Sequence, residues 1–277
     1  TGGKFAIYLL LQYLCGKNSP IKDTPEQVVE VIIPAPYWVS YPAITNIMEG
    51  KSVVVKTTEF GGWKLTPELL NSVVTKNSKI LILNNGVNPT GAIYSREEMK
   101  SLMDAAHKLG LTVISDEVYS GLVYTGDEYV SCGSFPEYKD NVIIVQSMSK
   151  SFSMTGWRVG YIGAPKNIAD ACNKIQGQFT SGTCSIAQRA TIAAVNADPA
   201  VLKDMVAAFE SRRELVLAAL NAMPGVKCNR PGGAFYVFPD ISSFFGKTAG
   251  DMKIDSAEAL CMFLLDKGVA LVSGEAF

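Results

Sequence analysis

Histidine is almost absent from this 277-residue chain, in which His107 is the only one. Catalysis by a Ser-His or Cys-His pair would have to use that residue. Its place in a helical pattern just before Gly110 instead favours a surface histidine near a helix C-terminus. The six cysteines are scattered and form no CxxC pair. They predict reduced thiols and no metal site.

Long apolar runs and an excess of one charge are also missing. The sequence contains no run of eighteen apolar residues, so no segment is predicted to form a membrane-spanning helix. The balance of 25 basic and 26 acidic residues gives no electrostatic preference for nucleic acid or a membrane surface. With 48% hydrophobic side chains, the chain is expected to be a soluble protein of one large or two smaller domains. The scattered cysteines indicate an intracellular protein, and a cytoplasmic location is expected.

Short apolar runs alternate with helical patterns along the chain, which is typical of an α/β fold with a mostly parallel sheet. Strands are predicted at residues 31–33, 53–55, 80–83, 111–115, 142–145, 158–163, 232–238 and 269–272. Helices are predicted at residues 5–15, 96–109, 167–176, 185–195, 199–223 and 256–267, with a further helix start at Thr66. Ser95 and Glu98 form a capping-box pattern before the second of these helices.

Lys150 follows the apolar run 142–145 and a turn of small residues. Open α/β sheets keep their active sites at the exits of such strands. An amine beside the Ser147 hydroxyl, with Arg158 eight positions later, suits imine formation with pyridoxal phosphate. For Lys150 alone, a solvated lysine after a strand is the competing interpretation.

Two other strand exits carry polar residues that suit the same cofactor. Asp116 directly follows the run 111–115. A buried carboxylate there needs a cation such as a protonated pyridine nitrogen. A helix N-cap is the alternative role for this aspartate. Asn88 lies in an Asn-Pro-Thr-Gly sequence after 80–83, which taken alone is also a turn.

The N-terminal segment offers an anion site and an aromatic ring. Gly2 and Gly3 precede an apolar helical run, and the free amides of a helix N-terminus favour an anion. Trp38 lies in an aromatic cluster after 31–33 and could stack on a pyridine ring, although such clusters are more often core.

These motifs together resemble the class I and II pyridoxal-phosphate aminotransferases, and the resemblance extends over nearly the whole chain. It is carried most specifically by Ser147, Ser149 and Lys150, followed by Gly-Trp-Arg-Val-Gly at 156–160. The resemblance implies fold type I, with a large cofactor domain over 1–198. A linking helix and part of a smaller domain would then occupy 199–277.

The resemblance also implies a role for each motif residue. Lys150 would be the catalytic residue and would hold pyridoxal 5'-phosphate as an aldimine. Trp38 and Asn88 would contact the substrate as well as the cofactor. The implied cofactor-binding residues are Gly2, Gly3, Lys4, Trp38, Asn88, Asp116, Tyr119, Ser147, Lys150 and Arg158.

The chain looks most like the bacterial-type aspartate aminotransferases, including those that accept prephenate. Aspartate with 2-oxoglutarate is therefore the leading substrate pair. The alternatives are an aromatic, prephenate or alanine aminotransferase, a lyase or synthase of the same fold, and a non-catalytic regulator. A homodimer is expected, with no nucleic-acid or membrane partner.

We also expect the chain to be part of a longer protein. Relative to the family pattern it starts at the phosphate turn and stops at Phe277, before the arginine that binds the substrate α-carboxylate. A targeting segment before Thr1 stays an open alternative. Residues 17–27 are predicted to form a polar loop, to which no role is assigned.

Overall fold

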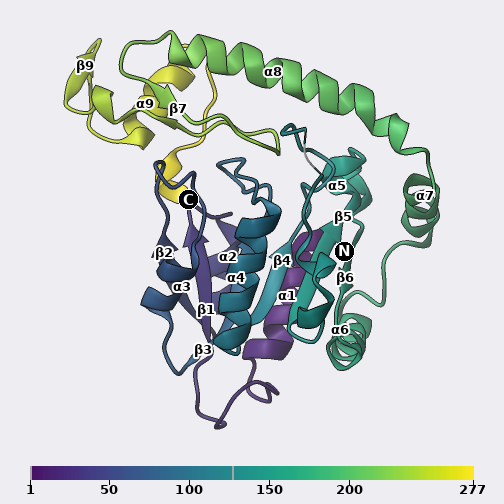
Figure 1. Cartoon of the computed structure of the whole chain (residues 1–277). Helices are drawn as coiled ribbons and strands as arrows, with labels where there is room; N and C mark the ends of the chain where they lie inside the picture. Colours follow the sequence, from purple (N-terminus) through teal and green to yellow (C-terminus); the bar gives the residue numbers. More distant parts are fainter. Residues whose placement is uncertain (1, 127) are drawn as a thin grey trace.

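A computed structural model describes residues 2–126 and 128–277 (Figure 1). Its centre is a six-stranded sheet with the strand order β2-β1-β3-β4-β5-β6. The first five strands of that order pair in parallel, and β6 pairs antiparallel with β5. The strands are β1 (Glu30–Ala35), β2 (Lys51–Lys56), β3 (Ser78–Asn84), β4 (Thr112–Asp116), β5 (Val142–Ser147) and β6 (Gly160–Gly163). The predicted mostly parallel α/β sheet is confirmed.

Both faces of the sheet are buried, which explains why its strands are continuous apolar runs. Along β1, Val31 and Ile33 belong to one core cluster, and Ile32 between them belongs to the other. Along β3, Ile80 and Leu81 divide in the same way. This alternation follows from the two-residue period of a strand.

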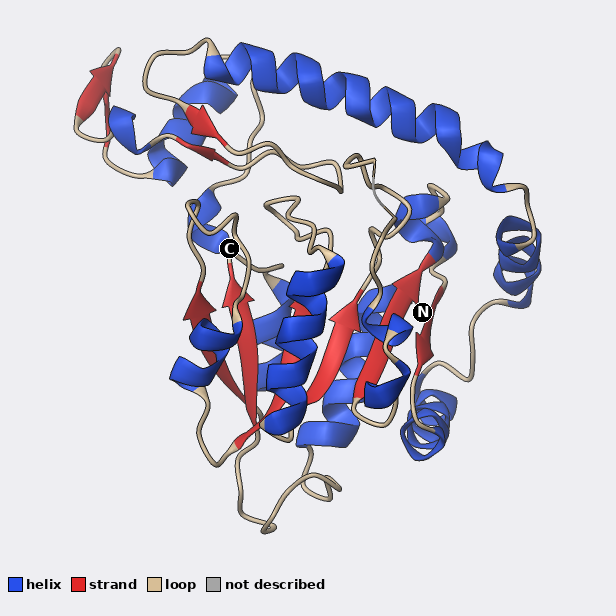
Figure 2. Cartoon of the chain, in the orientation of Figure 1, coloured by secondary structure: helices blue, strands red, loops and turns tan. Residues whose placement is uncertain are grey.

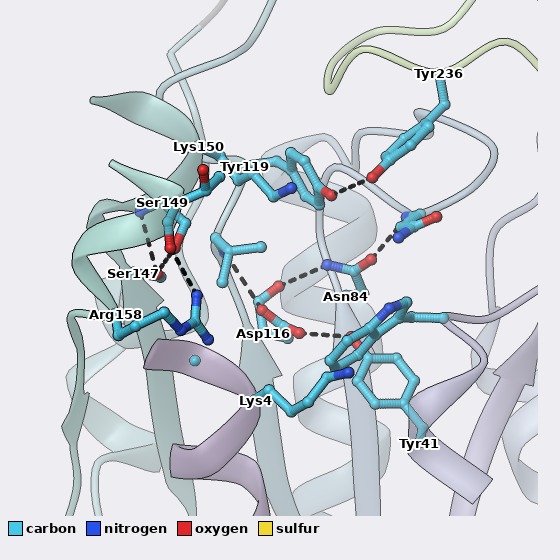
Figure 3. A pocket seen from close by; sticks show the side chains of 15 residues that line it. Lys4, Tyr41, Asn84, Asp116, Tyr119, Ser147, Ser149, Lys150, Arg158 and Tyr236 are labelled. Atoms are coloured by element: carbon cyan, nitrogen blue, oxygen red, sulfur yellow. Dashed lines mark hydrogen bonds between the residues drawn. The ribbon is translucent and has the colours of Figure 1, made fainter. Parts of the chain in front are cut away.

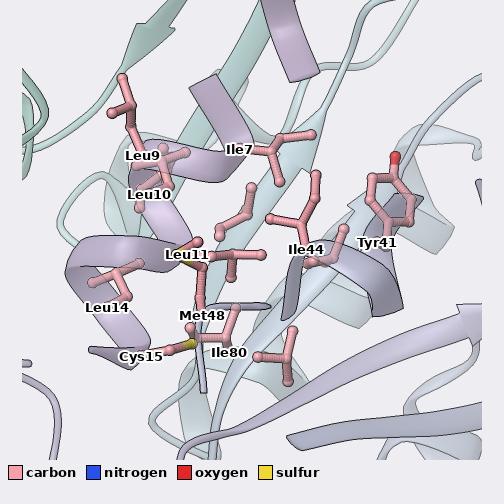
Figure 4. Packing of buried hydrophobic residues seen from close by; sticks show 14 of the residues in the cluster. Ile7, Leu9, Leu10, Leu11, Leu14, Cys15, Tyr41, Ile44, Met48 and Ile80 are labelled. Carbon is pink, nitrogen blue, oxygen red and sulfur yellow. The ribbon is translucent and has the colours of Figure 1, made fainter. Parts of the chain in front are cut away.

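Helices cover the two faces (Figure 2). On one face lie α1 (Gly2–Cys15), α2 (Ser40–Ile47) and α6 (Lys166–Phe179), and on the other lie α3 (Pro67–Val73) and α4 (Arg96–Lys108). Figure 4 shows apolar side chains of α1 packed beside Ile44 and Met48. Leu10, Leu11 and Leu14 are completely buried there, so α1 is a core helix. It starts beside the carboxyl end of β5, where a Cβ on Gly3 would lie 3.6 Å from the Ser147 Cβ.

Local signals in the sequence define several helix starts. The Thr66 hydroxyl accepts a hydrogen bond from the Leu69 amide, which caps α3. Ser95 and Glu98 form the predicted capping box of α4. The α4 helix ends in the positive-φ turn of Gly110, with His107 exposed in its last turn as predicted.

The remaining elements extend from the sheet across its upper edge (Figure 1). The long helix α8 crosses above the carboxyl ends of the strands toward the small C-terminal elements. The α-helices of this part are α5 (Met148–Ser151), α7 (Ser185–Val195), α8 (Lys203–Asn221) and α9 (Ala257–Asp266). Its short strands are β7 (Lys227–Cys228), β8 (Pro239–Asp240), β9 (Lys247–Ala249) and β10 (Met252–Ile254). None of the described helices is both long and apolar enough to span a membrane.

Three predicted strands need correction. Residues 232–238 contain only an isolated bridge between Gly233 and Val123, because the backbone of this segment bonds to two separate turns. Residues 269–272 have no strand, and Val272 is 75% exposed. The strand predicted from Arg158 begins at Gly160, since Arg158 itself has the left-handed φ of 55°.

Candidate active site

A pocket of about 310 Å³ lies at the carboxyl ends of the parallel strands, where open α/β sheets bind ligands. It collects all the predicted site residues except Gly2 (Figure 3). Its lining residues are Gly3, Lys4, Trp38, Tyr41, Asn84, Asn88, Asp116, Val118, Tyr119, Ser147, Ser149, Lys150, Thr155, Arg158 and Tyr236. Residues far apart in the chain therefore meet at one edge of the sheet.

Lys150 lies on the four-residue helix α5, immediately after β5. Its Nζ is 5.7 Å from the centroid of the Tyr119 ring and 5.0 Å from that of Phe235. Burial lowers the pKa of its ammonium group below the ordinary lysine value. Within the described part of the chain no carboxylate forms an ion pair with it. The environment thus makes the ammonium form less favourable than in an exposed lysine, which is the direction that a nucleophilic amine requires.

Asp116 ends β4 and is only 4% exposed. The Tyr41 hydroxyl donates to its Oδ2 at 2.6 Å, and the Val118 amide donates to its Oδ1 at 3.4 Å. Burial nevertheless raises the pKa of this carboxyl to about 6. Among the described residues it has no ion-pair partner, so the carboxylate is placed to stabilise a cation inside the pocket.

Asn88 is presented by the turn after β3. Asn84 holds this turn, because its Oδ1 accepts from the Asn88 amide at 2.8 Å and its Nδ2 donates to the Asp116 carbonyl at 2.8 Å. The Asn88 Oδ1 is buried and has no hydrogen-bond partner among the described atoms. A buried amide with an unused oxygen is suited to a polar ligand.

Another part of the pocket wall is formed by the start of α1 together with Arg158. A Cβ added to Gly2, whose φ is 80°, would lie 2.7 Å from Arg158 Nη2, so only glycine lets the guanidinium approach the helix start. The Arg158 Nη1 donates to the Thr155 carbonyl at 2.8 Å. Ser147 Oγ lies 2.8 Å from Ser149 Oγ and accepts from the Ser149 amide. Amides, hydroxyls and a guanidinium together suit a phosphate group.

Trp38 and Lys4 form the opposite wall. The Trp38 ring meets the Tyr41 ring edge to face, with 5.4 Å between the centroids. The Lys4 Nζ lies 4.8 Å from the centroid of the Trp38 ring, so this ammonium faces the pocket from the side of the tryptophan (Figure 3).

Sequence patterns did not single out Tyr41, Asn84 or Tyr236. Tyr41 closes the aromatic segment that begins at Tyr37, and Asn84 precedes the Asn88 turn, so both had a weak local signal. Tyr236 comes from the segment predicted as a strand, and its hydroxyl lies 2.6 Å from that of Tyr119. Only the crossing of two distant segments creates this contact. In the described chain no group of His, Cys, Asp or Glu side chains could hold a metal ion.

The family follows from comparison with known proteins. The family model described as aminotransferase class I and II matches residues 25–277. The chain belongs to this family. An aspartate/prephenate aminotransferase of Cereibacter sphaeroides is 42% identical over 281 residues, covering 100% of this chain and 68% of the relative. The solved aspartate aminotransferase of Rhizobium meliloti has a TM-score of 0.91 at 34% identity and covers 100% of this chain and 68% of that one. The fold is therefore fold type I of the pyridoxal-phosphate enzymes.

The length of the match differs among these relatives. A bifunctional aspartate aminotransferase and glutamate/aspartate-prephenate aminotransferase of Petunia hybrida is 43% identical over 254 residues, which cover 90% of this chain and 53% of that protein. The chain thus spans about half of this plant relative and about two thirds of the bacterial one.

Proposed function

We propose that this aminotransferase-family chain forms the pyridoxal-phosphate site of a transaminase, which moves an amino group between an amino acid and a 2-oxo acid. The observation that carries the proposal is the pocket itself. The half-buried amine of Lys150, the buried carboxyl of Asp116 and the guanidinium of Arg158 all line this one cavity. Any one of these groups alone could have another role, and it is their combination that supports pyridoxal phosphate as the cofactor.

The residues present fit pyridoxal phosphate. Asp116 is a buried carboxyl with no cation beside it among the described residues, and the buried Oδ1 of Asn88 has no partner. A Cβ at Gly2 would fill the space against Arg158. When bound, the cofactor would supply an electron sink for the carbanion formed at the substrate Cα.

Each residue then has a definite task. Lys150 would bind the cofactor covalently and, once released, carry the proton that leaves the substrate Cα. Asp116 would keep the ring nitrogen protonated, with its own charge supported by the Tyr41 hydroxyl. Trp38 would stack on the ring, and Asn88 and Tyr119 would bond its phenolic oxygen. Ser147, Arg158 and the amides of Gly2 and Gly3 would bind the phosphate. Lys4, which the resemblance adds to this set, has its ammonium group 4.8 Å from the centroid of the Trp38 ring, on the opposite wall of the pocket.

Aspartate and 2-oxoglutarate are the proposed substrates. The names of the similar proteins support aspartate: the relative from Cereibacter sphaeroides is an aspartate/prephenate aminotransferase, and the solved protein from Rhizobium meliloti is an aspartate aminotransferase. The choice of 2-oxoglutarate rests on the family resemblance. Prephenate is the second candidate substrate, supported by the aspartate/prephenate name of the Cereibacter sphaeroides relative. A lyase or synthase would use the same cofactor residues and differ in its products.

We further propose a cytoplasmic homodimer, with residues 1–198 as the large domain and 199–277 as part of the small one. Large apolar side chains are exposed on α6 and α7, where Phe179 is 57% and Ile186 is 72% exposed. A surface of this kind supports association with a second subunit.

Peptide mapping tests the covalent site. The protein is incubated with pyridoxal phosphate, reduced with borohydride and digested, and the mass of the cofactor is located. We expect it on the peptide that contains Lys150. Lys4 lies in the same pocket and provides an internal control, because random modification would label both lysines. Label on Lys4 with none on Lys150 would contradict the proposal.

Product analysis separates the two reaction classes. With aspartate and 2-oxoglutarate, a transaminase forms oxaloacetate and glutamate in equal amounts. A lyase would release ammonia or a thiol together with a 2-oxo acid, and no new amino acid. The Lys150→Ala variant serves as the control, and its turnover is expected to be lower by about 10³-fold or more.

A further inference from the structure

The segment 229–238 belongs to the C-terminal part of the chain, and its Tyr236 points into the pocket (Figure 3). Backbone hydrogen bonds hold this segment in place. The amides of Gly232 and Gly233 donate to the Gly91 carbonyl at 2.9 and 3.0 Å. The Ala234 amide donates to the Leu122 carbonyl at 2.9 Å. One segment therefore bonds both to the turn that carries Asn88 and to the segment that follows Tyr119.

Close packing allows this segment little freedom. A Cβ at Gly91 would lie 2.4 Å from the Pro231 Cβ and 2.7 Å from the Gly233 carbonyl oxygen. Arg213 of α8 is 7% exposed, and its Nη1 donates to the Pro231 carbonyl at 2.9 Å. The position of Tyr236 is thus determined by contacts on both sides of the segment.

Two adjacent side chains of this segment face the catalytic groups. The Phe235 ring lies 5.0 Å from Lys150 Nζ, and the Tyr236 hydroxyl lies 2.6 Å from the Tyr119 hydroxyl. Tyr119 is 3% exposed, so its hydroxyl depends on protein or ligand partners for its hydrogen bonds.

We propose that Tyr236 is a positioning residue, whose hydroxyl donates to Tyr119 and so directs the Tyr119 proton toward the phenolic oxygen of the cofactor. A tyrosine hydroxyl has a single proton. If Tyr119 donates into the pocket, the 2.6 Å bond between the hydroxyls must be donated by Tyr236. Accepting that bond also makes Tyr119 a stronger donor. This inference rests on the proposed function, because it assumes that Tyr119 meets the cofactor.

A double-mutant cycle on cofactor binding tests the inference. The dissociation constant of pyridoxal phosphate is measured by absorbance for the parent protein, Tyr119→Phe, Tyr236→Phe and the double variant. We expect Tyr236→Phe to weaken binding about threefold to tenfold, because one hydrogen bond in a buried network is lost while the ring remains. In the Tyr119→Phe background the same change is expected to have less than about a twofold effect.

Tyr124→Phe is the matched control. The Tyr124 hydroxyl donates to the Ala234 carbonyl at 2.5 Å, so this variant loses a tyrosine hydroxyl bond to the same segment outside the pocket. Its cofactor affinity is expected to change by less than about twofold. An equal loss in Tyr124→Phe and Tyr236→Phe would show that the segment merely loosens, and would overturn the proposal.

Two further outcomes would also overturn it, and they separate this inference from the proposed function. If the parent protein carries the cofactor on Lys150 but Tyr236→Phe binds it unchanged, or loses affinity equally in both backgrounds, Tyr236 does not act through Tyr119. If the parent protein binds no pyridoxal phosphate, the proposed function fails, and this inference fails with it.

Discussion

At the scale of single residues, the Asp116 carboxyl is the one acidic group among the described residues that line the pocket. It is buried at the end of a strand and has hydroxyl and amide donors but no cation among the described residues. Hydrogen bonds from Tyr41 and Val118 offset only part of the cost of removing the charge from water. The cofactor-free protein therefore keeps an unfavourable carboxylate that a pyridinium ring would stabilise.

A pH dependence of stability follows from this burial. The pKa of Asp116 is raised from 3.8 to about 6, so between these pH values the folded state holds the proton more tightly than the unfolded state. The free energy of unfolding of the cofactor-free protein should fall as pH rises from about 4 to about 6, by up to about 3 kcal/mol from this group. Asp116→Asn should remove that contribution, as measured by urea unfolding at several pH values.

Asp104 provides the control with the opposite sign. The hydrogen bonds from Lys100 and Tyr138 lower the pKa of the Asp104 carboxyl. Its contribution to the free energy of unfolding is therefore present above the ordinary aspartate pKa and is lost as pH falls. Asp104→Asn should therefore destabilise the protein at neutral pH and leave the Asp116 effect intact. Identical pH profiles for the parent and Asp116→Asn would contradict the assignment.

Tyr41 supports the charged form of Asp116. Its hydroxyl is the side-chain donor to Oδ2, and Tyr41→Phe would remove that bond while it keeps the ring that packs on Trp38. We expect the affinity for pyridoxal phosphate at neutral pH to fall about tenfold, the equivalent of one hydrogen bond to a charged group.

Tyr94→Phe is the comparison for this prediction. The Tyr94 hydroxyl accepts from the Leu65 amide at 2.8 Å and does not line the cofactor pocket. This variant should be less stable but should bind the cofactor normally. Equal losses of affinity in the two variants would show that the effect of Tyr41 is one of general stability.

At the scale of elements, the contact between the Asn88 turn and the segment 229–238 depends on Gly91. Its φ is 69°, and a Cβ there would lie 2.4 Å from Pro231. Gly91→Ala combines left-handed strain with a clash in a packed interior. We expect a loss of unfolding free energy of about 3 kcal/mol in urea denaturation, together with weaker cofactor binding.

Gly110→Ala separates the two causes. Gly110 has nearly the same φ, 68°, and a Cβ there would meet no atom within 4 Å. The free energy of unfolding of Gly110→Ala should fall by only about 1 kcal/mol, which is the cost of the left-handed backbone for a residue with a Cβ. This variant should bind the cofactor normally. If Gly91→Ala were no more destabilising than Gly110→Ala, the two segments would not be tightly packed against each other.

At the scale of the whole molecule, the exposed apolar residues of α6 and α7 predict where the interface of the proposed homodimer lies. Ile186 is 72% exposed and borders an open groove of about 780 Å³ beside Arg158. Ile186→Asp should weaken self-association at least about tenfold, because a charge would be buried against an apolar partner surface. Sedimentation velocity over a range of concentrations measures the change.

Leu215 on α8 is the matched position for that experiment, since it is also 72% exposed. Leu215→Asp should leave self-association unchanged if the interface lies on α6 and α7. A monomeric parent protein, or equal dissociation of both variants, would contradict the assignment of this surface.

Most of the sheet and its helices could be predicted from the sequence, because their signals are local. Thr66 caps α3 through an amide three residues away, and Ser95 does the same for α4. The buried strands are apolar on both faces, so each is a short continuous run. Lys150, Asp116 and Asn88 stand at strand exits, and parallel strands bring their exits to one edge.

Only the tertiary structure decided where the later segments lie and which hydroxyls complete the site. Residues 232–238 alternate like a strand, but their amides bond to Gly91 and Leu122, partners more than a hundred residues earlier in the chain. That arrangement turns Tyr236 toward Tyr119. The strand predicted at 269–272 was wrong for a different reason: among the described residues this apolar run pairs with no strand, and an apolar run forms a strand only where a neighbouring strand can pair with it. Composition and periodicity determine what a segment can form, and distant parts of the chain determine what it meets.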